Sequence, residues 1–147
     1  MIGYVTAGSN DLAISKPFYD AILAPLGGKV IVQSPKMIFY ARSNDTMFAI
    51  STPYDKQPCN FGNGTMIGFA ADSKSVVDEV HAIAIGLGAE DEGAPGYRTP
   101  EIYIAYFRDP YGNKLAVYNM PSVEEFARGA NERVRAMAEE AEALAKG

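Results

Sequence analysis

The sequence predicts an α+β fold made of two βαβββ units in tandem, followed by one long amphipathic helix. Three observations support this prediction. The pattern of strand, helix and further strands in residues 1–57 recurs in residues 65–119. The predicted helices of the two units end in similar sequences, "APLGGK" (24–29) and "IGLGAE" (85–90). The remaining residues, 121–147, carry apolar side chains at helical spacing.

The first unit is expected to begin with a strand at residues 2–7, followed by a helix. Asp11 belongs to the turn and cap signals ahead of that helix. We expect the helix to start near Ser15 and to end by Gly27, because Pro17 has no N–H and is tolerated best in a first turn. Three strands are then expected at 29–33, 37–41 and 46–51, separated by the turns "SPK" (34–36) and "SND" (43–45).

The second unit repeats this order after the linker "YDKQPCNFGNG" at 54–64. A strand is expected at 66–71, and a helix at 75–87, where Val76, Val80, Ile83 and Leu87 form one apolar stripe. Asp72 or Ser73 is expected to cap the helix. The sequence "EGAPGYRTPE" at 92–101 is rich in glycine and proline and is expected to form a mobile loop.

The sequence "YFRDPYGNKLAVYN" (106–119) predicts a hairpin with strands at 102–107 and 114–118. Asp109 can accept backbone N–H groups, Pro110 presets φ, and Gly112 tolerates positive φ. The turn residues are therefore assigned a structural role. Alternation predicts that Tyr103, Ala105 and Phe107 share one face of the sheet, and that Ile102, Ile104, Tyr106 and Arg108 share the other.

Residues 121–147 predict a third helix, which begins at a capping box of Ser122 and Glu125. About 24 residues in this helix would span about 36 Å. Its apolar stripe must be covered, and we expect it to pack on the body of the same chain, with a contact across a dimer as the alternative. The stripe comprises Val123, Phe126, Ala130, Val134, Met137, Ala141 and Leu144.

The composition is that of one ordinary globular domain. The chain has 147 residues, 48% of them hydrophobic, and carries 13 basic against 18 acidic residues for a net charge of −5. With no basic stripe, nucleic acid is not expected as a partner. No apolar run reaches the ~20 residues of a membrane span, and the N-terminus lacks the pattern of a signal peptide. We therefore expect a cytoplasmic protein with no membrane partner.

Cys59 and His81 are the only residues of their kinds. A disulfide framework is excluded, and so is a metal site built from several histidines or cysteines. Cys59 belongs to the linker and His81 lies at the border of the apolar stripe of its helix, with its polar tip expected at the surface. A structural role is expected for both.

Several segments together resemble the vicinal oxygen chelate superfamily, which includes glyoxalase I, bleomycin and fosfomycin resistance proteins and extradiol dioxygenases. They are "FYDAILAPLGG" (18–28), "GNGTMIGFAA" (62–71), "GLGAEDEG" (86–93) and "RDPYGNK" (108–114). The resemblance covers residues 1–120 but not the C-terminal helix at 121–147. It implies two βαβββ modules whose curved mixed sheets form a cleft, with a divalent metal held by His, Gln or Glu from the first and last strands of each module.

The residues at the implied ligand positions differ from those of metal-using relatives. The first-strand positions correspond to Tyr4 and Met66, and the last-strand position of the second module to Ala116. The fourth position, within 46–51, cannot be aligned, but that segment has no His, Glu or Asp. Neutral phenol, thioether and methyl groups are not metal donors of the kind required. We therefore expect no metal and no other cofactor.

The resemblance then favours a protein that binds a small, partly apolar molecule in its cleft, of the sequestering type. One alternative is an enzyme, either a lyase or isomerase like glyoxalase I or a relative of the dioxygenases. Another is a dimeric interaction protein. A homodimer is expected, and the catalytic residues of the enzymatic alternative stay unassigned. The residues predicted to contact the ligand are Tyr4, Met66, Arg98, Tyr103, Tyr106 and Ala116.

Overall fold

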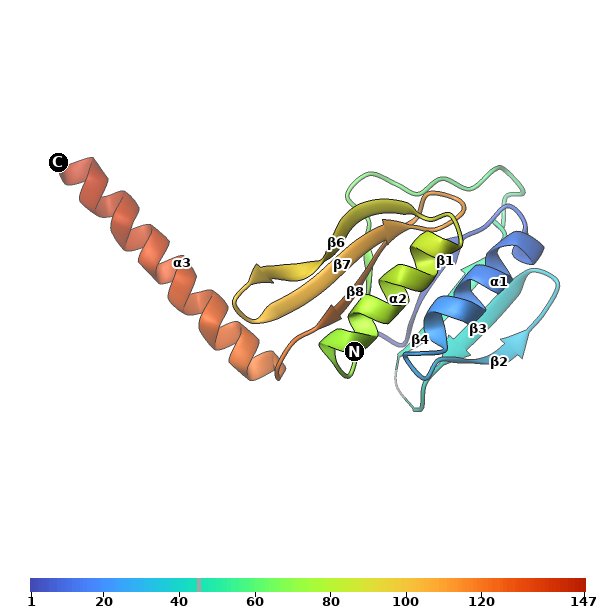
Figure 1. Ribbon diagram of the computed structural model, residues 1–147. Coiled ribbons are helices and arrows are strands. Elements are labelled where there is room, and N and C mark those ends of the chain that lie inside the picture. The colour runs from blue at the N-terminus through green and yellow to red at the C-terminus, as the bar shows by residue number, and fades with distance from the viewer. Residues whose placement is uncertain (45) are drawn as a thin grey trace.

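The computed structural model describes residues 1–44 and 46–147, so the predicted "SND" turn ends at a residue outside the described part. Both predicted βαβββ units and the C-terminal helix are confirmed (Figure 1). In the described residues, no helix is long and apolar enough to cross a membrane. The elements are β1 (Tyr4–Gly8), α1 (Leu12–Leu23), β2 (Lys29–Gln33), β3 (Met37–Ala41), β4 (Met47–Ser51), β5 (Ile67–Ala70), α2 (Lys74–Gly86), β6 (Glu90–Thr99), β7 (Ile102–Arg108), β8 (Lys114–Asn119) and α3 (Val123–Lys146).

Each unit forms its own four-stranded mixed sheet. The strand order is β1-β4-β3-β2 in the first sheet and β5-β8-β7-β6 in the second sheet. In both sheets the first strand of the unit runs parallel to the last strand, and the other pairs are antiparallel. The repeat seen in the sequence therefore folds twice into one topology.

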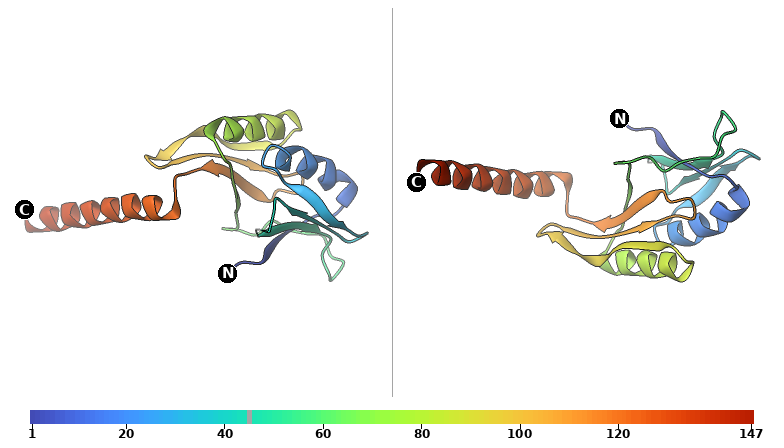
Figure 2. Two further views of the ribbon diagram at one scale, coloured as in Figure 1. Left: turned by 90° about the horizontal axis from the view of Figure 1, so that it is seen from below. Right: turned by 90° about the horizontal axis from the view of Figure 1, so that it is seen from above.

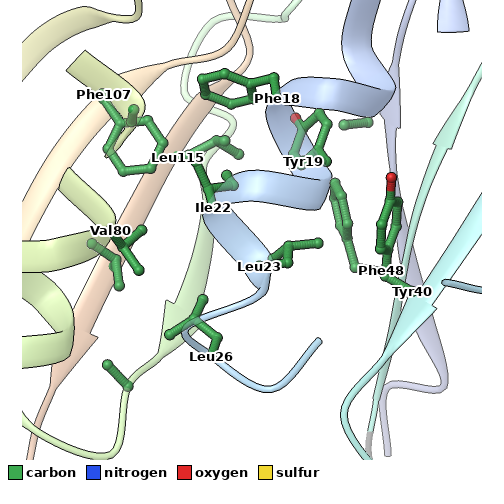
Figure 3. Packing of buried hydrophobic residues seen from close by; sticks show 14 of the residues in the cluster. Phe18, Tyr19, Ile22, Leu23, Leu26, Tyr40, Phe48, Val80, Phe107 and Leu115 are labelled. Atoms are coloured by element: carbon green, nitrogen blue, oxygen red, sulfur yellow. The ribbon is translucent and has the colours of Figure 1, made fainter. Parts of the chain in front are cut away.

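One hydrophobic core joins the two units, and α1 lies at its centre. Figure 3 shows Phe18 directed toward Phe107 of the second sheet, while Tyr19 faces Phe48 of the first. The ring centroids of these pairs are 6.3 Å and 4.9 Å apart. Helix α2 completes the core with the fully buried Val80 and its neighbours. The side of each sheet that faces away from the helices is called its outer face below.

The predicted alternation along β7 is confirmed, and it identifies the outer face. Tyr103, Ala105 and Phe107 belong to the core or pack against it. Tyr106, which alternates with these residues, lies on the outer face of the second sheet, as Ala116 does on β8.

The hairpin turn that follows β7 fastens the second unit to the first. The Asp109 carboxylate accepts the backbone N–H groups of Tyr111 and Asn113, each at 2.9 Å, and the Tyr19 hydroxyl of α1 at 2.6 Å. The Asn113 side-chain amide donates to the Gly8 carbonyl of β1 at 2.9 Å. The structural role predicted for the turn is therefore confirmed, and the turn also orients α1 against the second sheet.

The predicted start of the first helix is wrong, whereas its end falls before Gly27 as expected. Helix α1 begins at Leu12 and ends at Leu23, and its N-cap Asp11 accepts the Ala13 N–H at 2.8 Å. Pro17 consequently lies inside the helix, where its ring nitrogen cannot donate to a carbonyl one turn earlier. The Asp11 cap and the packing of Leu12 against the core outweigh that loss.

The segment expected to be a mobile loop at 92–101 mostly belongs to the ten-residue strand β6, so that prediction is wrong. Strand β6 is an edge strand, hydrogen-bonded on one side to β7, and its register shifts between Asp91 and Gly93, between Gly93 and Gly96, and near Thr99. An edge strand tolerates proline, glycine and bulges because one of its sides needs no partner.

The expectation that the C-terminal helix packs on its own chain is also wrong. Helix α3 has the predicted capping box of Ser122 and Glu125, but it leads away from the body and has no buried residue (Figures 1 and 2). An ion pair between Arg133 and Glu101 joins it to the β6–β7 turn. A Cβ at Gly129 would collide with the same carboxylate, so glycine permits this approach. The core is complete without α3.

Candidate functional site

A cavity of about 950 Å³ opens between the two units, along the edge strands β1 and β5. Its lining is mainly apolar and comes from both units. Pockets that bind small molecules measure roughly 300–1,000 Å³ and combine such a lining with a few polar groups. The lining side chains include Val5, Leu26, Phe48, Met66, Phe69 and Tyr118.

Two tyrosines in the cavity differ in what their hydroxyl groups can do. The Tyr40 hydroxyl donates to Asp20 at 2.9 Å, and burial together with this bond raises the pKa of Tyr40 well above its ordinary value. Tyr118 is half-buried, packs over Gly68, and has no hydrogen-bond partner for its hydroxyl in residues 1–44 and 46–147. Tyr118 is therefore the neutral donor that the cavity presents to a ligand.

A charged pair bridges the two units at the cavity. The Arg42 guanidinium, which lines the cavity, donates two hydrogen bonds of 2.9 Å to the carboxylate of Asp72 at the start of the second unit. Sequence reasoning did not assign Arg42 or Asp72 to the site. No spacing rule could have found the pair, because its members are thirty residues apart and meet only when the units pack.

The three implied ligand positions occupy different surroundings. Met66 lines the cavity, whereas Tyr4 and Ala116 do not. Tyr4 is 56% exposed and lies edge-on to Phe39 of the first sheet, with centroids 5.6 Å apart. Ala116 is fully buried on the outer face of the second sheet, opposite Gly68 in the β5–β8 register. The described contacts bring none of the three against another.

Arg98, Tyr106 and Ala116, by contrast, gather on the outer face of the second sheet. Ala116 is the register partner of Tyr106. The Arg98 guanidinium lies 5.7 Å from the Tyr106 ring centroid, and the Lys114 ammonium lies 5.5 Å from it. This side of the sheet combines an aromatic ring with cations. None of the three predicted residues lines the cavity, although Gly68, the register partner of Ala116, does.

Tyr103 lies on the opposite side of β7 from Tyr106. Its hydroxyl donates to Asp78 of α2 at 2.7 Å, and this hydrogen bond raises the pKa of Tyr103. It lines a smaller hollow of about 420 Å³ near the base of α3, together with Lys74, Glu101 and Met120. The predicted ligand residues are thus divided among the cavity, two outer sheet faces and this hollow.

His81 and Cys59 both lie in hydrogen-bonded surroundings, but the polar tip of His81 is not at the surface as expected. The His81 Nε2 lies 3.1 Å from the Asp91 carboxylate, and the ring packs near Phe107. His81 is more buried than expected, because α2 lies under the β6 strand that the sequence did not predict. The Cys59 N–H donates to the Asn10 side chain at 2.6 Å, and burial raises the pKa of its thiol.

The donor set for a metal ion is poor. In the part of the chain that the structure describes, no group of three or more His, Cys, Asp or Glu side chains is arranged to hold a metal. The implied positions Tyr4, Met66 and Ala116 offer a phenol, a thioether and a methyl group. These residues do not fit the divalent metal implied by the resemblance.

The chain belongs to the glyoxalase/bleomycin resistance protein family. A glyoxalase/bleomycin resistance protein from Albidiferax ferrireducens T118 is 41% identical, with a TM-score of 0.76 over 82% of this chain and 99% of its own. The match covers about 120 of the 147 residues. About 27 residues are therefore unmatched, which is close to the 24 residues of α3. The resemblance to the vicinal oxygen chelate superfamily is thereby confirmed.

Two more distant structures share the fold. One is a glyoxalase/bleomycin resistance protein/dioxygenase family enzyme from Burkholderia phytofirmans PsJN, with 23% identity and a TM-score of 0.65 over 81% of this chain and 98% of its own. The other is a lactoylglutathione lyase from Agrobacterium tumefaciens, with 22% identity and a TM-score of 0.60 over 81% of this chain and 92% of its own. No family model and no curated protein matches the sequence.

Proposed function

We propose that this protein binds a small, partly apolar molecule in the cavity between its two units and does so without a metal ion. The observation that carries the proposal is the cavity of about 950 Å³ lined by apolar side chains from both units, among them Leu26, Phe48 and Phe69. Removing apolar ligand surface from water supplies the affinity in such a site. The role is sequestration of the ligand.

The polar groups of the cavity narrow the choice of ligand. Tyr118 can donate one hydrogen bond from its hydroxyl, while Tyr40 is committed to Asp20. Arg42 adds positive charge at the wall of the cavity, although it is already held by Asp72. A ligand with an apolar body and one hydrogen-bond acceptor, neutral or anionic, fits these groups best.

A lyase or isomerase like glyoxalase I and a dioxygenase-related enzyme are the alternatives. Both would need donors for a metal or a general base at the reacting centre. The positions Tyr4, Met66 and Ala116 supply no imidazole or carboxylate for either role, so binding is favoured over catalysis.

The proposal includes a cytoplasmic homodimer without a nucleic-acid partner, in which residues 1–120 form the binding domain and residues 121–147 a separate helix. Exposed apolar side chains on the first sheet support a contact with a second copy, because such patches mark interfaces. They are Tyr4, Val30, Ile31 and Val32.

Ligand binding is tested with 8-anilino-1-naphthalenesulfonate, a fluorescent probe that is apolar and anionic. Wild type should bind it saturably, and Ala70→Trp, which places an indole in the cavity lining, should weaken binding at least about tenfold, or about 1.4 kcal/mol. Ala94→Trp is the matched control, since Ala94 is exposed on β6 outside the cavity. Equal affinity of both variants would refute the site.

The metal-free part of the proposal has its own test. Protein expressed in medium supplemented with metals is dialysed and submitted to elemental analysis. Less than about one-tenth of an equivalent of Zn, Ni, Mn or Fe per chain is the expected result, because the available side chains are weak donors. One equivalent surviving dialysis would refute this part and leave the binding test intact.

A further inference from the structure

Helix α3 carries an apolar stripe that its own chain does not cover. Val134, Met137 and Leu144 are 63%, 69% and 76% exposed. In the described residues, no hydrogen bond, ion pair or ring contact joins α3 to the body beyond Arg133. Because isolated helices are marginal in water, a stripe of this kind is a surface for a partner.

The stripe has the spacing of a coiled-coil seam. Seven residues recur at alternating steps of four and three: Val123, Ala127, Ala130, Val134, Met137, Ala141 and Leu144. An alternation of four and three keeps one seam directed at a facing helix along its whole length. The three alanines allow the backbones of two helices to approach closely. A second helix with the same repeat is therefore the occupant that fits.

We infer that α3 pairs in antiparallel orientation with α3 of a second copy of this chain. In that pairing each layer combines the two kinds of seam position, and one register pairs the six seam residues from Ala127 to Leu144. Val123, at the start of the helix beside the cavity, lies beyond the paired segment. Val134 packs against the partner's Met137, Ala130 against the partner's Ala141, and Ala127 against the partner's Leu144. Alanine faces leucine in the outer layer and valine faces methionine at the centre, while the layer of two alanines between them lets the backbones approach closely.

The charges on α3 favour this orientation over a parallel one. The middle of the helix carries Arg128, Arg133 and Arg135, and its end carries Glu139, Glu140 and Glu142. Antiparallel pairing places the basic segment of each helix beside the acidic segment of the other, whereas parallel pairing places like charges side by side. The helix macrodipoles also oppose each other in the antiparallel pair.

One ion pair follows directly from the register. Arg133 and Glu140 flank the seam on the same side, and the pairing brings Arg133 within reach of the partner's Glu140, with the reciprocal contact related by symmetry. Arg133 already donates to Glu101 at the base of the helix. A guanidinium has five N–H donors, so it can bind both carboxylates.

This inference extends the proposed homodimer to a named contact and does not depend on the ligand in the cavity. Single cysteines test it in the full chain with Cys59→Ser as background. Ala127→Cys and Leu144→Cys chains are mixed, allowed to exchange and oxidised. A disulfide between the two different chains is expected, because the register brings these positions into one layer.

A parallel pair would give the opposite pattern. It would join Ala127→Cys chains to one another, whereas antiparallel helices hold these two positions about 25 Å apart. Glu125→Cys mixed with Glu139→Cys is the control, because both positions face away from the seam and should remain reduced. Cross-links only between like chains, or none above the control, would overturn the inference.

A double substitution separates this contact from the proposed function. Val134→Lys with Met137→Lys places four positive charges at the centre of the paired seam and should lower the mass measured by sedimentation. Glu132→Lys with Glu139→Lys adds charge on the outward side and should leave it unchanged. Binding of the fluorescent probe should survive in both. An unchanged mass for the seam variant would refute helix pairing, whereas loss of probe binding in wild type would refute only the cavity.

Discussion

The hydrogen bond from Tyr19 to Asp109 is one of the contacts that fasten the two units, and Tyr19→Phe removes it alone. The hydroxyl and carboxylate oxygens are 2.6 Å apart, and Tyr19 is fully buried in α1. Phenylalanine has the same ring, so it keeps the packing of Tyr19 against Phe18 and Phe48. The substitution therefore measures the hydrogen bond rather than a cavity.

The expected loss of unfolding free energy in Tyr19→Phe depends on the hydrogen bonds that Asp109 keeps. Its carboxylate keeps three other bonds, from the N–H groups of Tyr111 and Asn113 and from the Asn113 amide. A hydrogen bond to a charged group contributes about 1.5–3 kcal/mol, and we expect a loss of about 2 kcal/mol because the carboxylate is not left unpartnered. For a chain of this size that corresponds to a fall of about 4–8 °C in Tm.

The effect should depend on pH in a defined direction. Burial, and then the charge and hydrogen bond of Asp109, raise the pKa of Tyr19 well above its ordinary value of 10.0. A group whose pKa is raised on folding stabilises the fold fully below its unfolded pKa and loses that contribution as pH rises above it. The stability gap between wild type and Tyr19→Phe should therefore be constant from pH 7 to 9 and narrow above pH 10.

The assay is urea unfolding followed by circular dichroism, because the chain has no tryptophan. Tyr118→Phe is the matched control, since the Tyr118 hydroxyl has no partner in the described residues and its loss should change the free energy of unfolding by less than about 0.5 kcal/mol. If Tyr19→Phe lowers the free energy of unfolding by no more than this control, the hydrogen bond from Tyr19 to Asp109 does not help to fasten the two units.

Two further predictions concern the second unit and the C-terminal helix. Gly112→Ala should cost about 1–3 kcal/mol in urea unfolding, because φ is +82° and the new Cβ would lie 2.7 Å from Cδ1 of Phe61. Gly64→Ala, with φ of +86° but open space, is its control and should cost less; equal costs would mean that the Phe61 contact is irrelevant. Truncation after Pro121 should leave Tm at low protein concentration within about 2 °C of wild type, because α3 has no buried residue. A larger fall would show that α3 stabilises its own chain.

The resemblance and the local patterns predicted most of the fold. The strands at 29–33 and 37–41 and the hairpin at 102–119 depend on alternation and on turn residues that are neighbours in sequence. The capping box of Ser122 and Glu125 is equally local. Such features need no knowledge of distant contacts, so the sequence alone determines them.

The wrong predictions, and the site residues that the sequence did not reveal, depend instead on contacts between segments far apart in the chain. Strand β6 exists because β7 offers it a partner, although its own glycines and proline indicate a loop. Pro17 is tolerated inside α1 because the surrounding helix is buried between the units. Met66, one of the predicted ligand residues, lines the cavity, whereas Arg42 and Asp72 meet beside it only through packing between segments far apart in the chain.

The sequence by itself thus determined the two repeated units, their strand faces, and the absence of conventional donors at the implied metal positions. Tertiary structure decided how the two units meet around α1 and where the cavity opens between β1 and β5. It also decided that α3 leaves the body with its apolar stripe uncovered. The physical reason is that periodicity states which side of an element is apolar, whereas only the packing of distant elements determines what covers that side.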